Sequence, residues 1–113
     1  MTKDYKAFAA EVDQRAVELF KAAPGAMRGF RGLMEEAGKD GALTGKVKEL
    51  MALGIAIAAR CEGCVVYHVR AAMKKGATRE EVAETIAVAI EMGGGPATVY
   101  GAEALAAFDA LSK

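Results

Sequence analysis

Two cysteines and one histidine, the only ones in the chain, form the pattern Cys61-x-x-Cys64-x-x-x-His68. The surrounding segment is rich in alanine and predicts a helix, on which residues three and four positions apart share a face. The two thiols are then close enough to form a disulfide, and His68 lies one turn beyond Cys64. A dithiol beside a base is suited to thiol–disulfide chemistry.

The arrangement could also supply a thiolate. A free thiol has a pKa near ~8.5, which a helix N-terminus or a neighbouring imidazolium lowers. If the helix begins near Cys61, both thiols lie close to its unpaired N–H groups. His68 can take the proton from Cys64 as a general base. We therefore predict Cys64 as the attacking thiolate and Cys61 as its resolving partner.

Two other interpretations of the same residues remain open. A zinc ion could be held by Cys61, Cys64, His68 and a fourth ligand such as Glu49, although three ligands from one helix make a tetrahedron awkward to close. Alternatively, both cysteines are small core residues. We expect a catalytic dithiol with no metal and no cofactor.

Glu49 is the other candidate, because it opens an otherwise apolar stretch. A buried carboxylate has a raised pKa and can relay protons. It could equally belong to a polar first turn with Lys46 and Lys48. In one straight helix Glu49 would lie about 18 Å from Cys61. It reaches the cysteines only if the chain turns between them, or if another subunit supplies one of the two.

The chain is predicted to be all-α, a compact bundle of about six helices forming one domain over residues 1–113. Apolar stripes at helical spacing mark helices near 5–20 and 27–37. Thr44 can cap a third helix to about residue 60, which is apolar all round and therefore expected to be buried. The cysteine helix ends near residue 75, with Gly63 and Arg70 on its expected solvent face. Thr78 opens a capping box for a fifth helix, and Pro96 starts the sixth.

Composition and charge narrow the classes of partner. The 113 residues are 53% apolar, which is high for a small monomer and favours a homo-oligomer. Fifteen basic residues balance 15 acidic ones, so neither a nucleic acid nor an anionic membrane is expected as partner. Residues 1–6 lack the apolar core of a signal peptide, and the most apolar stretch, 50–59, is too short to span a bilayer. We expect a cytoplasmic protein, where a structural disulfide is unusual.

Taken together, these residues resemble a family signature. Glu49, followed after eleven residues by Cys61-Glu62-Gly63-Cys64-Val65-Val66-Tyr67-His68, is similar to the pattern of the alkylhydroperoxidase D-like proteins of the carboxymuconolactone decarboxylase family. The stretches from Gly76 to Val82 and from Gly95 to Gly101 also resemble that family. The resemblance covers about residues 20–110.

The resemblance implies a fold of about six helices that assembles as trimers or hexamers. It implies that Glu49 and His68 deprotonate Cys64, which attacks a hydroperoxide and becomes a sulfenic acid. Cys61 then closes the disulfide. The reductant would be another dithiol, which in the family can be a lipoyl-bearing protein. The resemblance further implies that a turn in the chain brings Glu49 to the cysteines.

The sequence departs from the pattern at one position. Some alkylhydroperoxidases of this type have a further histidine immediately before the second cysteine, where this chain has Gly63. This leaves the strength of the peroxidase activity open. The decarboxylase branch lacks the cysteine pair, so Cys61 and Cys64 argue against a decarboxylase-like lyase. We therefore predict a thiol-dependent oxidoreductase that reduces hydroperoxides or exchanges disulfides. The alternatives are a decarboxylase-like lyase and a non-catalytic metal-binding or structural oligomer.

Overall fold

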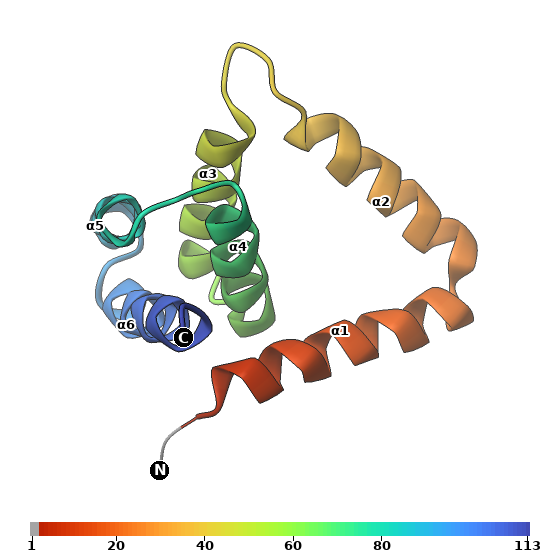
Figure 1. Cartoon of the computed structure of the whole chain (residues 1–113), viewed down its shortest axis with the longest axis horizontal. Helices are drawn as coiled ribbons and strands as arrows, with labels where there is room; N and C mark the ends of the chain where they lie inside the picture. The colour runs from red at the N-terminus through yellow and green to blue at the C-terminus, as the bar shows by residue number, and fades with distance from the viewer. Residues whose placement is uncertain (1–2) are drawn as a thin grey trace.

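The computed structural model describes residues 3–113, which form six α-helices and, within that range, no strand (Figure 1). The helices are α1 (Tyr5–Ala22), α2 (Pro24–Gly38), α3 (Gly45–Ala58), α4 (Glu62–Lys74), α5 (Arg79–Gly93) and α6 (Gly95–Leu111). The prediction of an all-α chain of about six helices is confirmed. Within residues 3–113, none of these helices combines the length and the apolar character needed to cross a membrane.

Local signals in the sequence begin most of these helices. The Thr44 hydroxyl accepts a hydrogen bond from the N–H of Val47 at 3.2 Å, which caps α3 as predicted. Thr78 and Glu81 form the predicted capping box at the start of α5. At the other end of α5, Gly94 adopts a φ of 70°, so α6 begins at Gly95, one residue earlier than predicted.

The helices divide into a packed body and an arm. Helices α3 to α6 pack on one another, and the first half of α1 lies across α4 and α6 (Figure 1). From there α1 and α2 extend away from the body as two sides of an open angle. No residue of α2 is buried, and Ala9 is the one buried residue of α1. Apart from Ala9, the core therefore lies in the packed body. The apolar side chains of α2 are not buried against any other part of the described chain.

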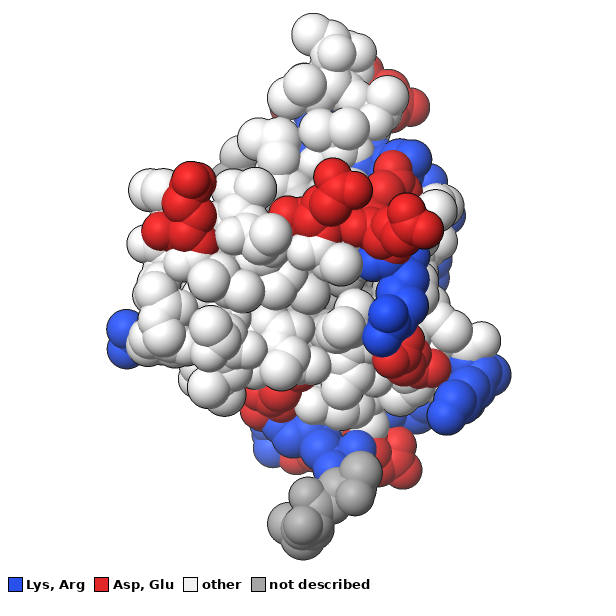
Figure 2. All heavy atoms as spheres, turned by 90° about the vertical axis from the view of Figure 1, so that its left-hand side faces the viewer, with Lys and Arg blue, Asp and Glu red and all other residues white. Residues whose placement is uncertain are grey.

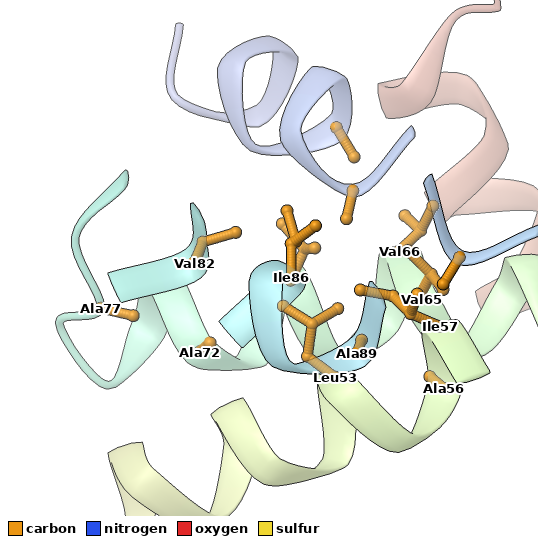
Figure 3. Close-up of a cluster of buried hydrophobic side chains, with 14 of the residues drawn as sticks. Leu53, Ala56, Ile57, Val65, Val66, Ala72, Ala77, Val82, Ile86 and Ala89 are labelled. Atoms are coloured by element: carbon orange, nitrogen blue, oxygen red, sulfur yellow. The ribbon is translucent and has the colours of Figure 1, made fainter. Parts of the chain in front are cut away.

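The core is built from branched aliphatic side chains packed against alanines. Leu53 and Ile57 of α3 meet Val65 of α4 and Ile86 of α5 in the interior (Figure 3). Helix α6 adds mainly alanines, which let its backbone approach α5 closely. Contrary to the expectation from its composition, α3 is buried on only one side, because Met51 and Ile55 are 51% and 67% exposed.

Gly101 marks the closest approach of α6 to α5. A Cβ atom at this position would lie 2.5 Å from Cγ2 of Ile86, a branched core side chain that cannot swing aside (Figure 3 shows Ile86). We expect Gly101→Ala to lower the free energy of unfolding by about 1–3 kcal/mol through overpacking. Urea denaturation at one protein concentration measures the difference in the free energy of unfolding between the variant and the wild type. Gly29→Ala, in open space on α2, is the matched control and should be neutral or stabilising. Equal stability of the two variants would contradict the close approach.

Candidate active site

The cysteine pair lies where α4 begins. Cys61 is the N-cap residue, and its Sγ accepts a hydrogen bond from the backbone N–H of Cys64 at 3.3 Å. The two are joined by a disulfide, with Cα atoms 5.2 Å apart. Cys64 is exposed, whereas Cys61 is half-buried. The prediction that the helix begins near Cys61 is therefore correct, and the Cys61 sulfur caps the first turn of α4.

A tight turn between α3 and α4 reverses the chain. Arg60 has a φ of 60°, in the left-handed region that few residues other than glycine adopt, and the N–H of Cys61 bonds back to the carbonyl of Ala56 at 3.1 Å. Helix α4 consequently runs back alongside α3 (Figure 1). Because α4 lies against α3, Glu49 is closer to the cysteine helix than it would be in a single straight helix.

Glu49 and His68 meet across this reversal. Nδ1 of His68 lies 2.8 Å from Oε2 of Glu49, and each side chain is 22% exposed. An ionised carboxylate can only accept, so Nδ1 carries the proton and Nε2 of a neutral ring is left as the base. Glu49 thus fixes the tautomer of His68, rather than belonging only to a solvated first turn.

The four predicted site residues are brought together on two adjacent helices. His68 follows Cys64 by four residues in α4, so the two share a face of that helix. Glu49, from α3, contacts His68. The structure therefore places the hydrogen-bonded Glu49–His68 pair about one helical turn from Cys64.

Helix α1 supplies neighbours that the sequence did not indicate. Asp13 binds the guanidinium of Arg70 through two hydrogen bonds of 2.7 and 2.9 Å, and Val12 packs against Gly63. The face of α4 that was expected to meet solvent therefore meets α1 in part. Near the cysteines, Lys3 pairs with Glu62 and holds the pKa of that carboxyl below its usual range. Lys3 is 59 positions away along the chain, and no local pattern links the two.

The pairing of Asp13 with Arg70 makes a pH-dependent contribution to stability. The hydrogen bonds from Arg70 hold the pKa of Asp13 below its ordinary value, so the contribution is present above that value and is lost as pH falls through the lowered pKa. Because the Asp13 side chain is 52% exposed, we expect Asp13→Asn to cost about 0.5 kcal/mol at pH 7. Urea denaturation from pH 7 to 2.5 measures this. A cost that stays constant over that range would contradict the ion pair, and Glu18→Gln controls for loss of an α1 carboxylate.

A resident metal ion finds no support in the geometry. Among residues 3–113, no group of three or more histidine, cysteine, aspartate or glutamate side chains is placed to hold one. In this structure both cysteine sulfurs are committed to each other. The positions of the side chains in residues 3–113 therefore do not support the zinc interpretation.

Comparison with known families agrees with the fold and the motif. The family model described as the carboxymuconolactone decarboxylase family matches residues 24–107. The chain belongs to this family. An uncharacterised protein of Cupriavidus necator is 45% identical over 112 residues, which span 99% of each chain. The family resemblance drawn from the sequence is thereby confirmed.

Two solved structures of family members are similar to this fold. A carboxymuconolactone decarboxylase family protein from Legionella pneumophila superposes with a TM-score of 0.93 at 41% identity, covering 99% of this chain and 100% of that one. A family member from Thermotoga maritima, for which a role in the antioxidative response has been suggested, gives a TM-score of 0.82 at 26% identity and covers 92% and 89% of the two chains.

Proposed function

We propose that this family member is a thiol-dependent oxidoreductase that reduces hydroperoxides and is regenerated by disulfide exchange. The observation that carries the proposal is a Cys61–Cys64 pair at the N-terminus of α4, one turn from a histidine held by Glu49. The suggested antioxidative role of the Thermotoga maritima relative supports it. A related alternative is that the protein exchanges thiols with disulfide substrates and does not reduce hydroperoxides. This activity would use the same residues.

In the oxidative half, Cys64 attacks because it is the exposed residue of the pair. Nε2 of His68 takes the thiol proton, and the thiolate attacks the terminal oxygen of the hydroperoxide. The S–O bond forms as the O–O bond breaks, and the alkoxide leaves as an alcohol after taking the proton from His68. Cys64 is now a sulfenic acid. Cys61 displaces its oxygen as water and forms the disulfide.

In the reductive half, an external dithiol attacks the disulfide at the exposed Cys64. Cys61 is the better leaving group, because its sulfur already accepts the N–H of Cys64 at the helix N-terminus and so favours the thiolate. The second thiol of the reductant then releases Cys64 and becomes a disulfide itself. The net reaction converts a hydroperoxide and a dithiol into an alcohol, water and a disulfide.

The reductant in this proposal is a dithiol, and the family resemblance points to a lipoyl-bearing protein. The cycle needs a compartment that supplies reducing dithiols, which the cytoplasmic location expected from the sequence would provide. We also propose that the working form is a homo-oligomer, a trimer or hexamer, in keeping with the family resemblance.

Steady-state turnover with cumene hydroperoxide and dihydrolipoamide tests the proposed function. We expect the wild-type protein to consume both in equal amounts, and Cys64→Ser to give only the uncatalysed rate. A wild-type rate no higher than that of Cys64→Ser would end the proposal. Stoichiometric zinc in the purified protein, with stability lost on chelation, would instead favour a metal-binding role.

A further inference from the structure

The first turn of α4 carries a negative charge beside the cysteine pair. Glu62 lies between Cys61 and Cys64 in the sequence and is the first residue of the helix. An ionised Cys64 thiol places a second anion in the same turn. The helix N-terminus favours both anions, but the two repel each other, so the carboxylate of Glu62 opposes ionisation of Cys64. The ionised thiol is the form that attacks.

A lysine from outside α4 is held against this carboxylate. Nζ of Lys3 forms an ion pair with Glu62, and a second one, of 3.0 Å, with Glu103 of α6. The same ammonium lies 4.7 Å from the centre of the Phe8 ring and 5.8 Å from that of Tyr5, both on α1. The hydroxyl of Tyr5 donates a hydrogen bond of 3.2 Å to Glu103. Groups on three helices therefore fix the position of one ammonium.

This environment differs from that of an ordinary surface lysine. A lysine on an open surface moves among many conformations, and a single ion pair there contributes little. The Lys3 side chain is only 33% exposed and contacts two carboxylates. Figure 2 shows acidic and basic side chains side by side at the lower end of the molecule, where α1 begins in Figure 1. The charge of Glu62 is therefore matched by a cation in the folded protein.

The other charged groups that reach α4 are matched without Lys3. Asp13 of α1 binds Arg70, and Glu49 of α3 binds His68. Arg60 precedes the cysteines and is exposed. Within residues 3–113, the one ion pair of Glu62 is with Lys3. Removal of Lys3 therefore leaves an unmatched carboxylate in the turn that holds Cys64.

We propose that Lys3 masks the charge of Glu62 and so allows Cys64 to ionise near neutral pH. Lys3 acts through Glu62, so it is a positioning residue and not a catalytic one. Tyr5 and Glu103 keep its ammonium in place. The inference rests on the proposed function for its purpose, because a thiolate is what attacks the hydroperoxide. The ionisation of Cys64 itself can be measured without any peroxide.

The pH dependence of Cys64 alkylation by iodoacetamide tests the masking. A Cys61→Ser background leaves a single thiol, and circular dichroism checks that each variant folds. In this background, we expect Lys3→Met to raise the pKa of Cys64 by about 0.5 at low salt, which slows alkylation at pH 7 about threefold. At about 1 M salt the difference should largely disappear, because charges are then screened beyond ~3 Å. A difference that arises from altered packing would persist in salt.

A second substitution separates masking from a structural role of Lys3. When Lys3→Met is combined with Glu62→Gln, the cluster of Lys3, Glu62 and Glu103 regains the net charge that it has in the wild type. The pKa of Cys64 should then return close to its value in the Cys61→Ser background. If Lys3 only holds the segment before α1 in place, the double variant should be as impaired as Lys3→Met alone.

Lys6→Met is the matched control, since the exposed Lys6 of α1 bonds to the backbone carbonyl of Lys113 at 3.0 Å. It should leave the pKa of Cys64 unchanged. An unchanged pKa in Lys3→Met, a difference that salt does not reduce, or no recovery in the double variant would overturn the proposal. A protein that shows the shift and its reversal but does not turn over cumene hydroperoxide would uphold the inference and contradict only the proposed function.

Discussion

Cys64→Ser is expected to abolish hydroperoxide turnover, with a loss of at least about 10³-fold, as for removal of a nucleophile. A serine hydroxyl at this position has nearly the size of the thiol but is not oxidised by a hydroperoxide. The disulfide cannot form either, so both halves of the cycle stop. Oxidation of dihydrolipoamide by cumene hydroperoxide measures the effect. Turnover retained in Cys64→Ser would show that another group carries the chemistry.

The Cys61→Ser variant separates two steps of the cycle: the attack of Cys64 on the hydroperoxide, and the closure of the disulfide by Cys61. This variant keeps the exposed residue Cys64 and the Glu49–His68 pair, so one equivalent of hydroperoxide should convert Cys64 to a sulfenic acid that dimedone traps. Multiple turnover with the dithiol should be slow, because the internal disulfide is missing. If Cys61→Ser is inert and Cys64→Ser forms the trapped sulfenic acid, the proposed roles of the two cysteines must be exchanged.

Glu49→Gln is expected to slow single-turnover oxidation of the dithiol at pH 7 by about 10²-fold, the lower range for loss of general-base catalysis. The glutamine keeps the size of the side chain but not the charge that holds the proton on Nδ1 of His68 at 2.8 Å. Thiolate formation then depends on solution pH, so the rate should recover as pH rises toward the ordinary pKa of a thiol, ~8.5.

Rapid-mixing measurements of thiol loss from pH 6 to 9.5 test this second prediction. His68→Gln should behave in the same way, because the carboxylate acts through the imidazole. Glu91→Gln, at an exposed position of α5, controls for the loss of one negative charge. Unchanged rates in Glu49→Gln at all pH values would mean that the Glu49–His68 hydrogen bond has only a structural role.

The features predicted correctly from the sequence depend on residues close together in the chain. The capping residues Thr44 and Thr78 act within three positions of themselves, and the start of α4 at Cys61 places two thiols by helical spacing alone. The all-α fold follows from apolar stripes of the same period. These interactions do not require knowledge of how the helices pack.

The meeting of Glu49 and His68 could not be derived from spacing, because it depends on the chain reversal at Arg60. An arginine gives no sign that it will adopt a φ of 60°, as a glycine would. The family resemblance, and not the geometry of a single helix, anticipated the turn. The position of α1 against Gly63 and Arg70 was missed for a similar reason, since Val12 and Asp13 are far from them in sequence.

Burial was also only partly predictable. The apolar composition of α3 indicated a fully buried helix, whereas the apolar stripe of α2 indicated only that a helix forms there. An apolar pattern identifies which face needs cover, but not whether that cover comes from the same chain. The exposure of Ile55 and Phe30 could therefore not be predicted from the sequence.

The most direct test of the proposed function is to count thiols in the reduced protein before and after one equivalent of cumene hydroperoxide. Before the peroxide is added, one thiol should have a depressed pKa. Afterwards, we expect loss of both thiols, one equivalent of cumyl alcohol, and an intact chain two hydrogens lighter. Two thiols of ordinary pKa that both remain titratable after the peroxide would contradict it.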